Sequence, residues 1–228
     1  MKQIIGSSIG ILLLCACAST DVGNPIDTEI SFATYEGVAS DFEALTLDNG
    51  ITLEQAFVKV RGFQLDRSEA CDDTSSSYDE PILVDLLTGI RSDVPLWDDE
   101  AGTFCRLRIE LTSDEVEGEP QALADAALYI QGSYQGETFK LRFEEAPALS
   151  LAGPFTLPVG SHLLQVGFFP VEWFGGVELE ELASANLPSS VGEKILSNFL
   201  ESGRLYHDTN QDGILDLIEL STSLAEGK

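Results

Sequence analysis

A run of oxygen-bearing side chains near the end of the sequence has the spacing of a calcium-binding loop. In an EF-hand loop of twelve residues, positions 1, 3, 5, 7, 9 and 12 supply oxygen ligands and a Gly at position 6 makes the sharp turn. In the stretch 208–219 these positions hold Asp208, Asn210, Asp212, the backbone carbonyl of Ile214, Asp216 and Glu219, with Gly213 at the turn. A hard cation needs this density of oxygen donors. The sequence therefore predicts a Ca²⁺ site.

An acidic turn that caps a helix is the alternative interpretation of this loop. It explains one or two of the donors but not the whole series, and Leu215 also supplies the apolar residue expected at position 8. A single loop outside the cell is expected to bind calcium weakly, on the order of 10⁻⁴ to 10⁻³ M. An affinity in this range suits a mainly structural role better than signalling.

We expect a helix on each side of the loop. Residues 190–193 have the spacing of a capping box, and the apolar residues that follow recur at helical spacing as far as Leu200. A short exiting helix would follow Glu219. The entering helix fits less well, because Gly203 weakens it and His207 stands just before the loop, where EF-hands carry an apolar residue.

Strand periodicity dominates the sequence before these helices. Ala56, Val58 and Val60 share one face of a predicted strand while Lys59 and Arg61 take the other. The phase of the alternation changes past Gly62, which predicts a β-bulge there. Residues 103–111 and 138–143 alternate in the same way. Several short strands at this spacing predict a mainly β protein, an antiparallel β-sandwich followed by a small EF-hand-like helix-loop-helix element.

The first residues have the pattern of a bacterial lipoprotein signal. Lys2 is followed by an apolar run too short to span a bilayer and then by small residues. The run Leu14-Cys15-Ala16-Cys17 resembles a lipobox, which predicts that Cys17 is lipidated, and Cys15 is the weaker candidate because bulky Leu14 precedes it. An ordinary secretory peptide cut nearby is the alternative. Both interpretations export the protein, but only lipidation anchors it to a membrane.

These patterns divide the sequence into four parts. We expect a lipoprotein signal peptide at 1–16, a lipidated tether at 17–27, a β-sandwich domain at 28–185 and an EF-hand-like segment at 186–228. Cys15 is expected to leave with the signal peptide and Cys17 to carry the lipid, so Cys71 and Cys105 remain. In an oxidising compartment these two are expected to form a disulfide. Closing a loop of about 35 residues would stabilise the fold by about 3 to 4 kcal/mol in the chain-entropy model.

Composition excludes some functions. The sequence has 12 Lys and Arg against 39 Asp and Glu, a formal charge of −27, which argues against nucleic-acid binding. Two histidines are too few for most metallo-hydrolase sites, and no nucleophile elbow or phosphate-binding Gly-rich loop occurs. Acidic pairs are too abundant to indicate a glycosidase. We therefore expect a protein that is not an enzyme.

A candidate anion-binding strip runs along three of the predicted strands. It consists of basic residues spaced two apart on the polar faces of these strands: Lys59, Arg61, Arg106, Arg108, Lys140 and Arg142. Such a strip could dock an anionic glycan or an envelope protein. The alternative is cross-strand pairing with Glu110, Glu137 or Glu144, where each exposed pair contributes only about 0.2 to 1 kcal/mol.

An aromatic group offers a second candidate recognition surface. Its members are Phe168, Phe169, Trp173 and Phe174. A glycan- or protein-recognition module on the outer membrane could use them as a platform for its ligand. The alternative is that they belong to the hydrophobic core, as large aromatic side chains usually do.

The sequence resembles a group of acidic, lipid-anchored envelope proteins of unknown function from myxobacteria and their relatives. The features that carry the resemblance are residues 21–25, Asp-Val-Gly-Asn-Pro, the long strand around 55–65, the segment Val-Asp-Leu-Leu at 84–87 and the terminal Asp-rich loop. The resemblance implies a location in a Gram-negative cell envelope and implies no known activity. The loop is also similar to thrombospondin type 3 and dockerin repeats, although dockerins need two such loops.

Overall fold

The computed structural model describes residues 25–35, 44–67, 71, 73–78, 81–88, 96–183, 187–211 and 215–228. Strands make up most of these residues: β1 (Pro25–Thr34), β2 (Leu45–Thr46), β3 (Ile51–Arg67), β4 (Asp73–Tyr78), β5 (Ile82–Asp85), β6 (Leu96–Glu100), β7 (Gly102–Leu111), β8 (Leu128–Tyr134), β9 (Glu137–Phe143), β10 (Leu149–Leu157), β11 (Gly160–Phe168), β12 (Arg204–Asp208) and β13 (Ala225–Gly227). The helices are α1 (Pro170–Trp173), α2 (Ser189–Ser202) and α3 (Leu217–Leu220), with 3₁₀ turns at Gln121–Leu123 and Leu179–Glu181. The prediction of a mainly β protein is confirmed.

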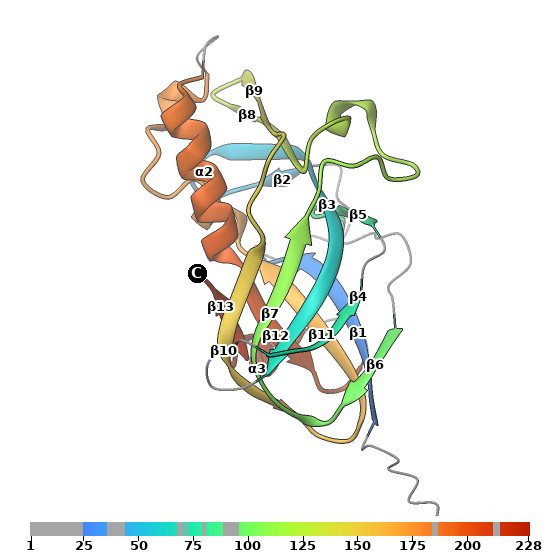
Figure 1. Cartoon of the computed structure of the whole chain (residues 1–228). Helices are drawn as coiled ribbons and strands as arrows, with labels where there is room; N and C mark the ends of the chain where they lie inside the picture. The colour runs from blue at the N-terminus through green and yellow to red at the C-terminus, as the bar shows by residue number, and fades with distance from the viewer. Residues whose placement is uncertain are drawn as a thin grey trace, which may run out of the picture.

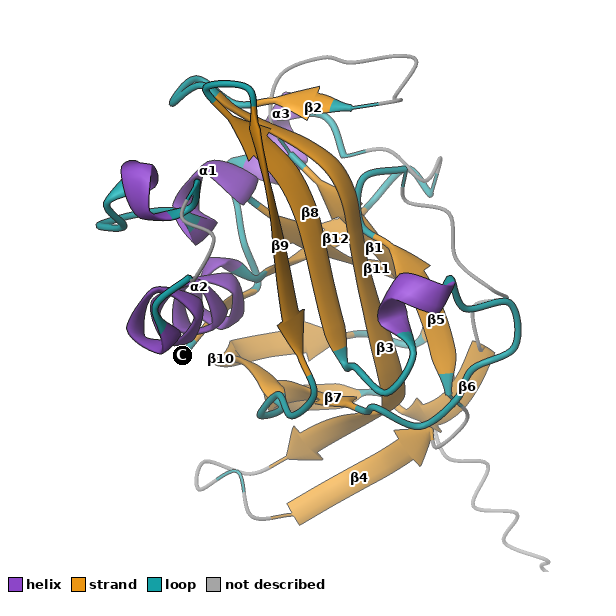
Figure 2. Cartoon of the chain, turned by 90° about the horizontal axis from the view of Figure 1, so that it is seen from above, coloured by secondary structure: helices purple, strands orange, loops and turns teal. Residues whose placement is uncertain are grey.

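The strands form one curled sheet (Figure 2). Their order is β6-β1-β11-β12-β13-β10-β7-β3-β8-β9, and β2, β4 and β5 each pair with β3 outside this path. Neighbours are antiparallel except β1 and β11, which run parallel with Ile26 opposite Gly160. The curl brings distant faces of the sheet together around one apolar core, so the arrangement is sandwich-like.

The strand β3 changes partners midway along one edge. Its first half pairs with β8 and its second half with β7. The change occurs at Lys59, whose amide donates to Ala127 O at 2.9 Å and whose carbonyl accepts from Thr112 N at 3.1 Å. The register shifts between Val60 and Gly62, which confirms the predicted bulge and bends β3 where the two partners diverge.

Helix α2 lies against one side of the sheet (Figure 1) and contacts α1. Phe199 of α2 stacks on Phe168 of β11 with ring centroids 4.9 Å apart and meets the edge of Trp173 at 5.4 Å. Trp173 is fully buried, and its indole N–H donates to Ser202 Oγ at 3.0 Å. A buried indole with a satisfied N–H fixes α2 to the core.

The segment after α2 returns to the sheet as two strands. β12 pairs with β11 and β13, and β13 pairs with β10. Gly227 N donates to Gly203 O at 2.8 Å. A side chain at Gly227 would collide with the backbone of Leu200 and Glu201, so glycine allows β13 to lie directly under the end of α2.

The disulfide between Cys71 and Cys105 is present, with Cα atoms 5.8 Å apart. It ties the residues after β3 to β7 across 34 positions of sequence, as predicted. In the described part of the chain, no helix is long and apolar enough to cross a membrane. Residues 1–24, which include the predicted signal peptide and Cys17, lie outside the described residues.

Candidate functional site

The predicted calcium loop begins at the end of a strand. Helix α2 ends at Ser202, and β12 then carries the chain from Arg204 to Asp208 as part of the sheet. The expected helix-loop-helix arrangement is therefore wrong on the entering side. Gly203 stops α2 with an extended backbone, φ −64° and ψ 135°, and hydrogen bonds to β11 hold the next five residues extended.

The first loop position is held inside the protein. Asp208 is fully buried at the end of β12, and its Oδ1 accepts a hydrogen bond from Gln211 N at 2.7 Å. Gln211 in turn donates from its side chain to Ser161 O at 2.9 Å, at the start of β11. A buried carboxylate thus starts the turn, and a side chain of the loop ties this turn to the sheet.

The last loop position returns to the first. Glu219 is also buried, and its Oε1 accepts from Thr209 N at 2.7 Å and from Thr209 Oγ1 at 2.6 Å. Its other oxygen accepts from Asp216 N at 2.9 Å. The carboxylate of position 12 therefore lies against the residue that follows position 1, which closes the loop.

Asp216, at position 9, caps the exiting helix. Its Oδ1 accepts from Ile218 N at 2.7 Å and from Glu219 N at 2.9 Å, so Asp216 and Glu219 form a reciprocal capping box. Leu215 is buried, as expected for position 8. The exiting helix α3 is present but spans only Leu217–Leu220.

Hydrogen bonding keeps the carboxylate of Glu219 ionised. Donation from the Thr209 hydroxyl, and then from the amides of Asp216 and Thr209, lowers the pKa of Glu219 to about 2. An acid with this pKa is an anionic oxygen donor throughout the neutral range. The arrangement can therefore present a charged carboxylate to a hard cation without first releasing a proton.

Three positions of the predicted site, Asp212, Gly213 and Ile214, lie outside the described residues. Asn210 is described and exposed. Over the ranges that the structure describes, no group of three or more His, Cys, Asp or Glu side chains is arranged to hold a metal ion. The fold brings together the two ends of the loop. Glu219, at the last position, accepts hydrogen bonds from Thr209, which follows Asp208, and from the capping residue Asp216.

Other polar groups surround the loop. Tyr35 donates its hydroxyl hydrogen bond to Gln165 Oε1, and burial, followed by the nearby Tyr206, raises the pKa of Tyr35. On the other side His207 lies beside His162, with Nε2 and Nδ1 3.1 Å apart. Burial, and then the neighbouring His162, lowers the pKa of His207. The two histidines are 45 residues apart in the sequence, so no local pattern predicts their contact.

The candidate anion-binding strip is divided by the fold. Lys59 is fully buried, and its Nζ donates to Glu119 Oε2 at 2.8 Å and to Ser113 O at 3.0 Å. Its predicted place on a polar surface is wrong, because loop 112–119 covers the point where β3 changes partners.

The other members of the strip keep surface positions. Arg106 forms an ion pair with buried Asp66, and Arg108 lies 3.6 Å from Glu110 of the same strand. Arg61, Lys140 and Arg142 are exposed, and Arg142 donates to Ala124 O. The pair of Arg106 with Asp66 of β3 is cross-strand, as the alternative expected, although Asp66 was not among the predicted partners. Arg108 pairs with the predicted Glu110, but within one strand.

The aromatic group is not a ligand platform. Phe168, Trp173 and Phe174 are buried, with exposed fractions of 1%, 0% and 3%, and Phe169 is half-buried. They belong to the core between α1, α2 and the sheet, as the alternative interpretation held. The proposed aromatic recognition surface is therefore wrong.

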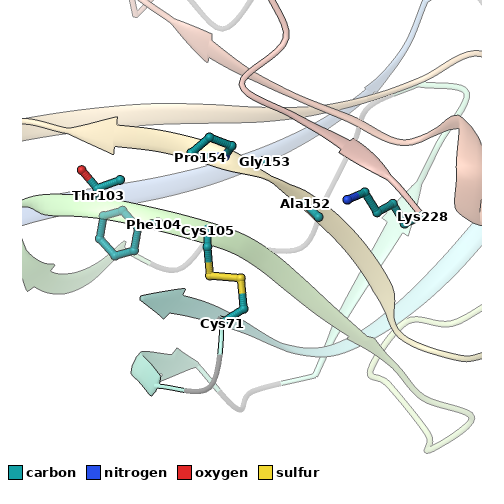
Figure 3. Close-up of a pocket in the computed structure, with 8 residues that line it drawn as sticks. All are labelled: Cys71, Thr103, Phe104, Cys105, Ala152, Gly153, Pro154 and Lys228. Carbon is teal, nitrogen blue, oxygen red and sulfur yellow. A yellow bond between two sulfur atoms is a disulfide. The ribbon is translucent and has the colours of Figure 1, made fainter. Parts of the chain in front are cut away.

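An open depression lies beside the disulfide (Figure 3). The disulfide, Thr103 and Phe104 of β7, residues 152–154 of β10 and Lys228 line its volume of about 620 Å³. Figure 3 shows the two sulfur atoms at its side, with Lys228 beyond Ala152. Among the residues described here, its lining holds one charged side chain, so it presents no acid and base pair for catalysis.

Comparisons with known proteins place the chain in no family. No protein-family model and no curated protein matches it. One solved structure that resembles it is MbnP from Methylosinus trichosporium, with a TM-score of 0.35 and 11% sequence identity over 66% of this chain and 77% of that one. A likeness this distant says nothing about activity.

Proposed function

We propose that this protein is a non-enzymatic, calcium-binding lipoprotein of the cell envelope, in which calcium has a mainly structural role. The observation that carries the proposal is the closure of the loop by two buried carboxylates. Asp208 and Glu219 stand at its first and last positions, and the pKa of Glu219 is lowered to about 2. Carboxylates are the donors that Ca²⁺ prefers.

The position of the loop in the fold supports a structural role. The stretch 208–219 connects β12 to α3, and β13 follows α3 and pairs with both β12 and β10. A cation bound between Asp208 and Glu219 would hold these elements in place. It would also offset part of the −27 formal charge, which disfavours the compact state through self-repulsion.

The envelope location rests on the signal-peptide pattern and on the disulfide. A Cys71–Cys105 bond fits an oxidising compartment, and the lipobox-like sequence before Cys17 supports anchoring through a lipid. We propose the outer membrane of a Gram-negative bacterium as the site of anchoring.

Thermal melts with calcium and with chelator test the metal site. Ligand that binds only the folded state stabilises it by mass action, which at 10 mM Ca²⁺ and a Kd of 10⁻⁴ to 10⁻³ M gives about 1.4 to 2.7 kcal/mol. For a chain of this size we expect Tm to rise by roughly 3 to 10 °C. Asp208→Asn should lose this rise while keeping the side-chain acceptor for Gln211 N.

The matched control is Glu180→Gln, which removes one exposed negative charge away from the loop. It should keep the full response to calcium. An equal loss of response in both variants would show that calcium acts through general charge screening, and a wild type that does not respond at all would leave the loop an acidic turn.

A further inference from the structure

The two histidines of the chain meet on neighbouring strands, outside the set of calcium donors. His162 lies on β11 and His207 on β12. His162 Nδ1 and His207 Nε2 are 3.1 Å apart, and the ring centroids are 5.1 Å apart. These are the only histidines in the sequence, so their contact is made by the fold and not by local sequence.

The far nitrogen of His162 fixes the tautomer of its ring. His162 Nε2 lies 2.6 Å from Pro158 O. A carbonyl oxygen can only accept, so Nε2 carries the hydrogen and Nδ1 of the neutral ring carries a lone pair that faces His207. A backbone carbonyl on the far nitrogen is also the arrangement that orients metal-binding histidines. His162 is buried, with an exposed fraction of 6%, which holds this orientation.

We propose that His162 and His207 bind a borderline divalent transition-metal ion of the zinc class, at a site separate from the calcium loop. Imidazole nitrogen suits such ions, whereas the hard oxygen donors of the loop suit calcium. Two metal–nitrogen bonds of about 2.05 Å at a tetrahedral angle place the nitrogens about 3.3 Å apart. The observed 3.1 Å is close to this separation.

Metal binding requires a change of tautomer at His207 and a tilt of the two rings that turns their facing nitrogens toward one ion. In the metal-free pair, His207 Nε2 donates its hydrogen to the lone pair of His162 Nδ1. If His207 carries its hydrogen on Nδ1 instead, both facing nitrogens present lone pairs to one ion. The carboxylates of Asp208 and Glu219 act electrostatically on His207, and this negative charge favours a cation at the pair.

A buried hydroxyl next to the pair gives independent support. Thr28 of β1 is opposite His162 in the parallel register and is fully buried. Its Oγ1 has no hydrogen-bond partner among the described residues. Leaving a buried hydroxyl without a hydrogen-bond partner is unfavourable. A water molecule bound to an ion at the His pair would supply the missing partner, and water would fill the remaining positions on the ion.

Cobalt spectroscopy tests this site, because tetrahedral Co²⁺ absorbs visible light strongly and calcium does not. The purified full chain is titrated with Co²⁺ in detergent. We expect a visible band that saturates near one equivalent and that Zn²⁺ removes. His207→Gln should lose the band, while circular dichroism and the melting temperature in chelator show that the variant remains folded.

Asp208→Asn separates the two sites. This variant should lose the calcium response but keep the cobalt band, and Glu180→Gln should keep both. The inference is overturned if the wild type gives no tetrahedral band, if His207→Gln keeps it, or if Asp208→Asn abolishes it, since the last result would place the ion in the calcium loop. If His207→Gln does not fold, NMR of the wild type replaces it as the test. Addition of Zn²⁺ should shift the ring signals of both histidines, and unshifted signals would refute the site.

Discussion

Buried charge is stabilised in different ways at two places in this protein, the partner change of β3 and the predicted calcium loop. Where β3 changes partners, the buried ammonium of Lys59 meets the carboxylate of Glu119 at 2.8 Å. At the loop, the buried carboxylate of Glu219 accepts hydrogen bonds from two amides and a hydroxyl. It forms no ion pair with any described residue.

The two places therefore differ in whether the protein itself supplies the opposite charge. The Lys59 site is neutral overall and complete within the chain, so its contribution to stability should not depend on calcium. The loop keeps a net negative charge that polar donors only partly offset. A region built in this way can take up a cation, and its stability should depend on calcium and on pH.

The largest expected effect comes from breaking the ion pair. Glu119→Ala leaves the ammonium of Lys59 buried with Ser113 O as its remaining described partner. Removing one member of a buried pair destabilises a protein by about 3 to 5 kcal/mol, and we expect the lower end because the Glu119 side chain is 13% exposed. Urea unfolding measures the change, which should be the same with calcium and with chelator.

Glu117→Ala is the control, since Glu117 is an exposed acid on the same loop. It should change the free energy of unfolding by less than about 0.5 kcal/mol. If Glu119→Ala is no more harmful than this control, or if calcium alters its effect, the Lys59 site is not complete within the chain.

A smaller effect is expected from the cap of α3. Asp216→Ala removes the acceptor of two amide hydrogen bonds and should cost about 0.5 to 1 kcal/mol in chelator. With calcium the loss should grow, because position 9 also supplies an oxygen donor. Chemical unfolding under both conditions gives the two values.

Asp216→Asn separates capping from charge, since Asn caps about as well as Asp. This variant should match the wild type in chelator and fall below it in calcium. Equal losses for Ala and Asn in chelator would mean that charge, and not the hydrogen-bonded cap, stabilises α3.

The smallest effect is a pH dependence that originates at Glu219. Its folded pKa of about 2 lies below the ordinary value of 4.5. As pH falls through this interval the unfolded state takes up the proton first, so stability present above pH 4.5 is lost toward pH 2. In metal-free buffer, Glu219→Gln should show a shallower fall over this window, measured by urea unfolding at several pH values. An unchanged slope would contradict the assignment, and Glu180→Gln should keep the wild-type slope.

Local patterns in the sequence predicted the features that depend on neighbouring residues. The bulge at Gly62 follows from a change of alternation within one strand, and Leu215 is the apolar residue expected in the loop. The cap that Asp216 forms agrees with the alternative interpretation of the loop, an acidic turn that caps a helix. The disulfide needed only the expected removal or lipidation of the first two cysteines. Each of these inferences uses a short stretch of chain or a small set of possible partners.

Features set by distant contacts could not be predicted in this way. Alternation placed Lys59 on a polar face, because nothing near it in sequence shows that loop 112–119 covers it. Residues 204–208 form a strand because β11 supplies the hydrogen-bond partners. The contact of His162 with His207 likewise requires knowing that β11 and β12 are neighbours.

The position of β13 in the sheet bears on how this protein is made. β13 follows every other described strand in sequence, yet it lies between β12 and β10. Until Ala225–Gly227 leave the ribosome, β12 and β10 lack the strand that joins them. The sheet therefore cannot close until the chain has been synthesised through Gly227, and calcium bound at the proposed loop site would act at this closing step.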